Sequence, residues 1–147
     1  MTDRSIVAWS DDLATGVPTL DRQHQALFLC VAELERAAGE RTMLSTCHAM
    51  EQLSRHARQH FAEEERLMRM NSYPDLEEHI EEHHDFSHRL FELRRSYLDH
   101  DISTDLITHL RAWLKDHVQK TDMDYVPYLA MRTDCLPTAR ACREAAR

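Results

Sequence analysis

Hydrophobic side chains recur at alternating steps of three and four positions in four separate segments of the chain. Such spacing gathers apolar residues on one face of an α-helix. The segments cover about residues 20–38, 41–70, 74–99 and 104–121 or beyond. Their apolar positions are, in chain order, Leu20, Leu27, Val31, Leu34 and Ala38; Met50, Leu53, Ala57 and Leu67; Leu76, Phe86, Leu90, Leu93 and Tyr97; and Ile107, Leu110 and Leu114. The pattern predicts an all-α protein.

Residues that end or begin helices lie between these segments. Gly39 suits the end of the first helix, and an Asn-Ser pair at 71–72 interrupts the second. Pro74 suits the first turn of the third helix, and Ser103 or Thr104 can cap the fourth. Because the joins are short, neighbouring helices should run antiparallel. The expected architecture is an up-down-up-down antiparallel four-helix bundle.

Length and composition favour one helical domain. The chain has 147 residues, enough for one hydrophobic core, and only two Gly and four Pro, which favours helices over a many-turned β fold. Residues 1–147 are therefore expected to form a single domain. It would consist of an N-terminal arm packed on the bundle (1–19), the four-helix bundle (20–130) and a short C-terminal tail (131–147).

Charge and cysteine content exclude several classes of protein. The formal net charge of -8 argues against nucleic acid as the main partner, since phosphate binding needs a basic face. No run reaches the ~18 apolar residues that span a bilayer, and the N-terminus lacks a secretory apolar stretch. We therefore expect a cytoplasmic protein without membrane insertion. Its cysteines should be reduced there, and no two form a C-x-x-C motif; they are Cys30, Cys47, Cys135 and Cys142.

The unusual feature of the composition is its 11 histidines. Five of them, with one glutamate, occupy positions within the apolar faces: His24 in the first segment, His60 and Glu64 in the second, His79 and His83 in the third, and His117 in the fourth. A polar group buried without a partner costs on the order of a few kcal/mol. Inside a bundle, these groups can satisfy one another by sharing cations. Imidazole nitrogens with carboxylate oxygens suit iron, and bridging carboxylates can hold two metals close together.

The remaining histidines fall outside the apolar faces and are expected on helix flanks or in solvent: His48, His56, His84, His88, His100 and His109. A single histidine on an apolar face is more often a core residue bonded to backbone or water. That alternative applies to His24 and to His117 taken one at a time. The occurrence of such residues on all four helices favours a metal site.

Asp122 follows His117 by five residues, which does not match a regular helix. Five residues rotate by about 140° around an ideal α-helix, so the two side chains would not both point inward. The apolar face also shifts by one residue here, to Val118 and Tyr125. A π-bulge or a loosened turn near Gln119 would bring both side chains inward, and such bulges often occur at functional sites.

In context, the residues read D-R-Q-H at 21–24, H-F-A-E-E at 60–64, H-I-E-E-H-H-D-F at 79–86 and W-L-K-D-H-V-Q-K-T-D at 113–122. A W…G…D-x-Q-H lead-in from Trp9 and Gly16 precedes them, and S-Y-P precedes the third helix. The chain thus resembles the hemerythrin family, and within it the single-domain bacterial members, over roughly residues 7–130.

The resemblance implies a role for each residue of the set. One iron would take His79, His83 and His117, and the other would take His24 and His60 and keep an open position. Glu64 and Asp122 would bridge the irons together with an oxo or hydroxo group. Dioxygen would bind reversibly at the open position, for storage, delivery or scavenging.

Apolar residues next to the ligands match the family's dioxygen pocket: Leu27, Phe61, Trp113, Leu114 and Val118. They would keep water from the irons, although core packing alone also accounts for each of them. No general base or nucleophile is evident beyond the ligands, so an enzyme is not expected. For Tyr125 and Tyr128, packing or a hydrogen bond to a ligand is expected rather than redox chemistry.

Two further functions stay open for the same site. One is a sensor, in which oxygen, nitric oxide or redox state alters a contact with a signalling partner. The other is a catalyst of the peroxidase, oxidase or nitric-oxide-reducing type. As a dioxygen store, the protein would serve an oxygen-using enzyme. For the sensor, Cys135 and Cys142 could pair under oxidation, or they could be two inert thiols.

Overall fold

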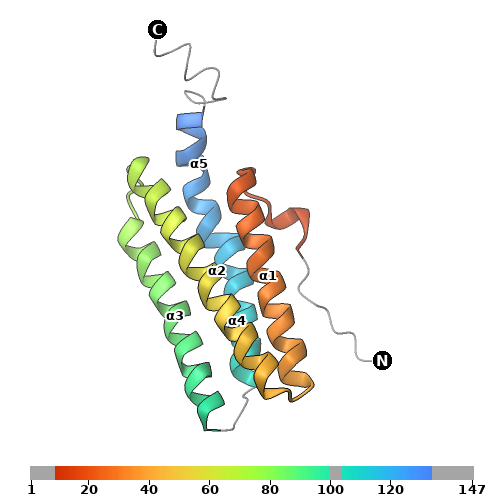
Figure 1. Ribbon diagram of the computed structural model, residues 1–147. Helices are drawn as coiled ribbons and strands as arrows, with labels where there is room; N and C mark the ends of the chain where they lie inside the picture. Colours follow the sequence, from red (N-terminus) through yellow and green to blue (C-terminus); the bar gives the residue numbers. More distant parts are fainter. Residues whose placement is uncertain (1–8, 100–103, 134–147) are drawn as a thin grey trace.

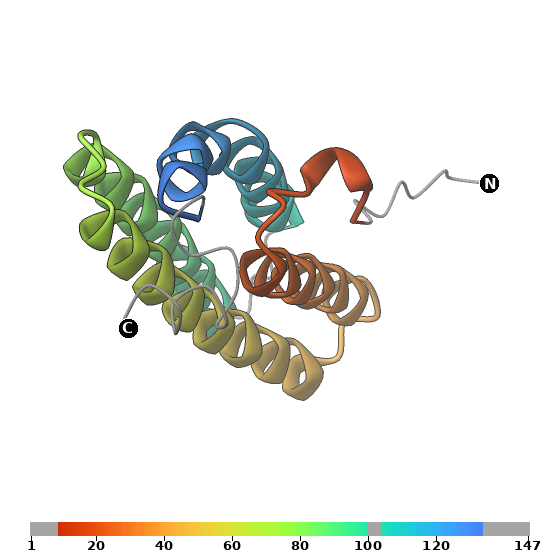
Figure 2. The same cartoon turned by 90° about the horizontal axis from the view of Figure 1, so that it is seen from above.

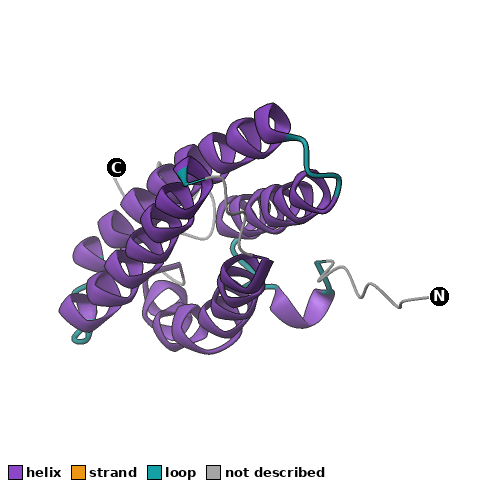
Figure 3. Cartoon of the chain, turned by 90° about the horizontal axis from the view of Figure 1, so that it is seen from below, coloured by secondary structure: helices purple, strands orange, loops and turns teal. Residues whose placement is uncertain are grey.

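The computed structural model describes residues 9–99 and 104–133, and this part of the chain contains helices and no strands (Figures 1 and 3). The helices are η1 (Asp11–Leu13), α1 (Pro18–Gly39), α2 (Met43–Met70), α3 (Leu76–Leu98), α4 (Thr104–Asp116), η2 (His117–Thr121) and α5 (Asp122–Thr133). Among these helices, none is both long and apolar enough to cross a membrane.

Four long helical columns form the bundle, and the fourth consists of α4, η2 and α5 in succession (Figure 1). Consecutive columns run in opposite directions. Seen from above, they form a closed ring in which α1 packs against α2 and α4, and α3 against α2 and α4 (Figure 2). The predicted up-down-up-down four-helix bundle is confirmed.

Local backbone chemistry sets the helix boundaries within a few residues of the expected ones. Helix α1 begins at Pro18, whose missing N–H costs nothing in a first turn. It ends at Gly39 as expected, but the left-handed residue that turns the chain is Arg41, with φ 55°. Ser72, with φ 53°, does the same after α2. Helix α3 starts at Leu76 rather than at Pro74, which lies in the preceding turn.

The fourth column contains the predicted irregularity. Residues His117–Thr121 form a π-helical turn between α4 and α5. The wider i→i+5 turn inserts one extra residue, which accounts for the one-residue shift of the apolar face. The prediction of a π-bulge near Gln119 is therefore confirmed. The column also extends farther than expected, because α5 continues to Thr133, beyond the predicted start of the tail at residue 131.

The described part of the N-terminal arm packs on the bundle, as predicted. Leu13 in η1 is buried in the main core, and η1 contacts η2. Asp21 holds the arm against α1: its Oδ1 accepts bonds from the backbone N–H of Thr15 at 2.7 Å and from the Thr15 hydroxyl at 2.8 Å. Gly16, with φ 84°, turns the chain between them.

The core has two parts, and we name them by size. The larger cluster fills the bundle and includes Leu27, Phe28, Leu34, Leu53, Phe86, Leu93, Leu110 and Leu114. The smaller cluster lies at the end of the bundle where α2 turns into α3, and it consists of Leu20, Met68, Tyr73, Tyr125 and Leu129. Three predicted core positions are only half-buried: Leu67, Leu76 and Tyr97. At the end of α2, Met68 takes the buried position that Leu67 was expected to hold.

Candidate metal centre

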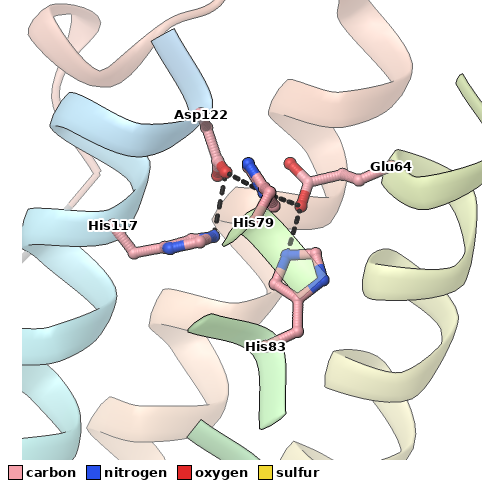
Figure 4. Close-up of side chains that lie close together, drawn as sticks. All are labelled: Glu64, His79, His83, His117 and Asp122. Atoms are coloured by element: carbon pink, nitrogen blue, oxygen red, sulfur yellow. Dashed lines mark hydrogen bonds and ion pairs between the residues drawn. The ribbon is translucent and has the colours of Figure 1, made fainter. Parts of the chain in front are cut away.

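The seven predicted ligands come from every column of the bundle and meet at its centre. They are His24 in α1, His60 and Glu64 in α2, His79 and His83 in α3, His117 in η2 and Asp122 at the start of α5. All are buried, with at most 3% of the residue surface exposed. Figure 4 shows five of them, with the two carboxylates facing three imidazoles. The structure therefore brings together the whole set that the sequence pattern selected.

Helical geometry accounts for this convergence. His60 and Glu64, and likewise His79 and His83, are four residues apart and lie on one face of their helices. His117 and Asp122 are five residues apart, and the π-helical turn between them aligns both side chains toward the centre. The extra residue of the π-turn therefore serves the site directly.

The two carboxylates divide the histidines into two groups, because each carboxylate directs one oxygen to each group. Glu64, Asp122, His79, His83 and His117 form the first group, and Glu64, Asp122, His24 and His60 form the second. Within each group, one ligand atom per residue lies within 4.8 Å of all the others. We call these the three-histidine half and the two-histidine half.

In the three-histidine half, the imidazole Nε2 atoms face Glu64 Oε2 and Asp122 Oδ1. His83 Nε2 lies 3.1 Å from Glu64 Oε2, and His117 Nε2 lies 2.9 Å from Asp122 Oδ1. His79 Nε2 lies between both carboxylates, 3.2 Å from Asp122 Oδ1 and 3.6 Å from Glu64 Oε2 (Figure 4).

In the two-histidine half, the other two carboxylate oxygens are used. His24 Nε2 lies 3.0 Å from Asp122 Oδ2 and 3.6 Å from Glu64 Oε1. His60 Nε2 lies 3.2 Å from Glu64 Oε1. Both carboxylates thus have the geometry of bridges between two centres.

Several polar atoms at this centre are buried without a hydrogen-bond partner among the described residues. They are Nε2 of His24, His60, His79 and His117, both carboxylate oxygens of Asp122, and Nδ1 of His24 and His79. Leaving such atoms unpaired costs free energy. Cations between the imidazoles and the carboxylates would satisfy most of them, and nitrogen with oxygen donors in this proportion suits iron. The buried cluster therefore fits a di-iron site.

Without a metal, the histidines and the carboxylates shift one another's protonation. Burial disfavours charge on His24 and His79, but their contacts with Asp122 and Glu64 outweigh it and raise the pKa of each to about 9. For Glu64 and Asp122, burial acts to raise the pKa, yet the neighbouring imidazoles hold the pKa of both carboxyls well below its usual range. In the metal-free protein, protons on the imidazoles therefore balance the negative charge of the two carboxylates. In the metal-bound protein, cations would balance it.

Three polar residues that the sequence pattern did not select orient the ligands from outside. His60 Nδ1 donates to Gln23 Oε1 at 2.8 Å, His83 Nδ1 to Glu65 Oε1 at 2.9 Å, and His117 Nδ1 to Glu82 Oε2 at 2.7 Å. A proton on Nδ1 leaves Nε2 free to bind a metal. Each outer partner adjoins a ligand in the sequence and bonds to a ligand on the next helix. That adjacency is the signal that could have found them.

Tyr125 contacts the centre from the smaller cluster. Its hydroxyl donates to Glu64 Oε1 at 2.5 Å. A hydrogen bond to a ligand was one of the two roles expected for this residue. Burial and the nearby Glu64 charge raise the pKa of Tyr125 far above its usual value, so it remains a donor. Tyr128, by contrast, is exposed and packs against Tyr73, with ring centroids 5.0 Å apart.

The five predicted pocket residues belong to the larger cluster or pack against it. Leu27, Phe61, Leu114 and Val118 are buried, and Trp113 is half-buried against the larger cluster. Phe61 stacks on the His83 ring at a centroid distance of 3.9 Å, and Trp113 stacks on His117 at 4.4 Å. The aromatic rings thus cover the three-histidine half. Near the two-histidine half, the ring centroid of Trp9 in the arm lies 6.4 Å from that of His24.

The other histidines that the structure describes take no part in the centre. His48, His84, His88 and His109 are exposed, and His56 is half-buried on its helix flank. His100 lies outside the described residues, as do Ser103, Cys135, Cys142 and most of the predicted tail. Cys30 and Cys47 are half-buried free thiols.

An antiparallel four-helix bundle with a buried, two-centre cluster of histidines and carboxylates defines a metal-binding helical bundle. The family model described as Hemerythrin HHE cation binding domain matches residues 15–129. The chain belongs to the hemerythrin family.

Individual relatives agree with this assignment. The chain is 30% identical to a bacteriohemerythrin of Stenotrophomonas maltophilia, over 82% of this chain and 80% of the relative. It is 27% identical to a myohemerythrin of Riftia pachyptila, over 80% and 88% of the two chains. The crystal structure of a leucine-to-phenylalanine mutant matches with a TM-score of 0.77 and 25% identity, covering 83% of this chain and 95% of that one.

Proposed function

We propose that the protein binds dioxygen reversibly at a non-heme di-iron centre, for oxygen storage, delivery or scavenging. The observation that carries the proposal is that each of the two central carboxylates serves both halves of the site. Glu64 and Asp122 each direct one oxygen to a three-histidine half and the other oxygen to a two-histidine half. One structural or catalytic metal would not need two such halves.

The residues would divide the work as follows. His79, His83 and His117 would hold one iron, His24 and His60 the other, and Glu64 with Asp122 would bridge them. A pair of irons held there would supply reversible two-electron exchange with dioxygen. With two histidines instead of three, the His24/His60 half has one protein ligand fewer. This difference supports placing dioxygen there.

The surroundings favour binding over catalysis. Leu27, Phe61, Leu114 and Val118 are buried in the larger cluster, and we propose that they would keep water from the metals. An apolar shell of this kind controls solvent access to a metal site and slows its oxidation. The side chains that do bring polar atoms to the ligands (Gln23, Glu65, Glu82 and Tyr125) are engaged in hydrogen bonds to them. We therefore propose a binding protein rather than an enzyme.

The test is optical. The purified protein is loaded with iron, reduced without air and then exposed to oxygen. We expect about two irons per chain and a visible absorption band that appears with oxygen and disappears when oxygen is removed. A band that forms and then decays irreversibly would favour the catalytic alternative. Fewer than about two irons per chain with no band would reject the di-iron assignment.

Two matched variants assign the ligands. His79→Ala removes a buried ligand, and we expect it to lower iron content and abolish the reversible band. His84→Ala removes an exposed histidine from the same helix and should change neither. Equal iron loss in both variants would show that the effect does not come from the buried cluster.

A further inference from the structure

The two halves of the centre differ in the charge of the groups that support their histidines. In the three-histidine half, the Nδ1 atoms of His83 and His117 donate to carboxylates, those of Glu65 and Glu82. In the two-histidine half, His60 Nδ1 donates to the neutral amide of Gln23. Within the described part of the chain, His24 Nδ1 has no hydrogen-bond partner, and neither has His79 Nδ1 in the other half. The anionic supports thus belong to one half.

Tyr125 adds to the same difference. Its hydroxyl donates to Glu64 Oε1, the oxygen that lies near His24 and His60. Glu64 Oε2, which faces His79 and His83, accepts no bond from Tyr125. A carboxylate oxygen that already accepts a short hydrogen bond has less electron density to offer a cation. Tyr125 therefore weakens the shared carboxylate toward the two-histidine half alone.

From these contacts we propose that the hydrogen bonds from Glu65, Glu82, Gln23 and Tyr125 give the two metal positions different affinities, one tight and one weak. The three-histidine half binds its divalent first-row cation first and more tightly, and the two-histidine half holds the second, exchangeable cation. The inference rests on the proposed two-metal function and deepens it. It assigns Glu65 and Glu82 as positioning residues for the tight position, and Gln23 and Tyr125 as residues that keep the other position weak.

The physical reason lies in the donor strength of imidazole. A carboxylate that accepts the Nδ1 proton makes the Nε2 lone pair more basic and also holds the ring in place. A neutral amide fixes the ring but raises its basicity less. Such outer partners typically change metal affinity by about 10- to 100-fold. Two outer carboxylates, Glu65 and Glu82, support the three-histidine half, and none supports the other half. This difference suffices to separate the two metal-binding steps.

The number of histidines alone would also favour the first half, so the test changes the outer partners and keeps all ligands. The metal-free full-length chain is titrated with Co²⁺ under nitrogen, and visible ligand-field absorption and chelator competition resolve the two steps. His83→Ala and His60→Ala assign the steps, since each should remove one of them. We expect the wild-type chain to bind two Co²⁺ ions in separate steps, the tighter one lost in His83→Ala.

Two substitutions then act in opposite directions. Glu82→Gln replaces a charged support by a neutral one and should weaken the first step by about 10-fold or more. Gln23→Glu supplies the missing charge and should strengthen the second step by a similar factor. Glu81→Gln changes the charge of an exposed neighbour on the same helix and should leave both steps unchanged.

The outcomes separate this inference from the proposed function. Two Co²⁺ ions bound with equal affinity, or two steps that Glu82→Gln and Gln23→Glu do not move, would overturn the proposed difference in affinity and leave the two-metal centre standing. Binding of a single ion would reject the two-metal centre itself. Loss of both steps in Glu82→Gln, with helical content unchanged, would show that Glu82 builds the whole site instead of strengthening one half.

Discussion

The larger and smaller clusters of the core lie on opposite sides of the metal centre, and they differ in how they are held together. The larger cluster joins apolar residues from α1, α2, α3 and α4, with Leu34, Leu53 and Leu110 fully buried. The smaller cluster has fewer members, and two of its links to the bundle pass through the centre. Tyr125 bonds to Glu64, and α5 begins at Asp122. Apolar burial stabilises both regions, and we expect the second to depend in addition on polar contacts that a metal would complete.

This difference explains why a protein can keep many unpaired polar atoms in its core. We expect the larger cluster, with its many buried apolar residues, to hold the bundle together without a metal. We expect the free-energy cost of the unpaired polar atoms to fall mainly on the smaller cluster and on α5 beside it. Four changes to the molecule test this division, from the largest expected effect to the smallest.

Removing the metal should separate the two regions most clearly. We expect chelation to increase amide hydrogen exchange in α5 and the first turn of α1 by at least about 100-fold, as in local unfolding, with little change around Leu53 and Leu110. The reason is that binding energy at the centre stabilises the elements that supply ligands. Hydrogen exchange with mass spectrometry measures both regions at once. A uniform increase along the chain would contradict the division.

Matched truncations in the two clusters should differ in the metal-free protein. Leu53→Ala, in the larger cluster, should lower the free energy of unfolding by about 2–5 kcal/mol with or without metal. Leu20→Ala, equally buried in the smaller cluster, should approach that cost only when metal is bound. Denaturant unfolding of both variants in both forms gives the comparison. Equal costs in the metal-free form would show that both clusters unfold together.

Raising the pH should lower the stability of the metal-free protein and leave that of the metal-bound protein unchanged. The pKa of His24 and of His79 rises from 6.5 to about 9 on folding, so their contribution to stability is complete below pH 6.5 and is lost as the pH rises through 9. We expect the free energy of unfolding of the metal-free chain to fall by about 3 kcal/mol or more between pH 6.5 and 9.5. The metal-bound form, with neutral imidazoles, should not show this loss. Urea unfolding of both forms across that pH range measures the difference. An equal loss in both forms would contradict the prediction.

Removing one hydroxyl from each region should give the smallest effects. Tyr125→Phe deletes a bond to a buried carboxylate and should destabilise the metal-free chain by about 1.5–3 kcal/mol. Tyr97→Phe deletes a bond of 2.6 Å to the Met43 carbonyl at the other end of the bundle and should cost below about 1.5 kcal/mol. Thermal unfolding can rank the pair. A larger effect for Tyr97→Phe would mean that the Tyr125 bond contributes little.

Much of this architecture follows from local rules, and so it was predictable from the sequence. The spacing of Leu27, Leu34, Leu53 and Leu110 specifies helices with one buried face, because side chains three and four residues apart lie together on any α-helix. The same periodicity separates His79 and His83 from their neighbours His84 and His88. The break in phase after His117 even located the π-turn.

Other features were decided only when the helices came together. Met68 is buried in place of Leu67 because α5 covers that side of α2, and nothing local to α2 states where α5 will lie. Gln23, Glu65 and Glu82 look like surface residues in the sequence; each bonds to a ligand on the next helix because of how the helices pack. The sequence by itself determined the helices and the candidate ligands, since both depend on position along one helix. The tertiary structure decided which half of the centre receives anionic support, since that depends on distances between helices.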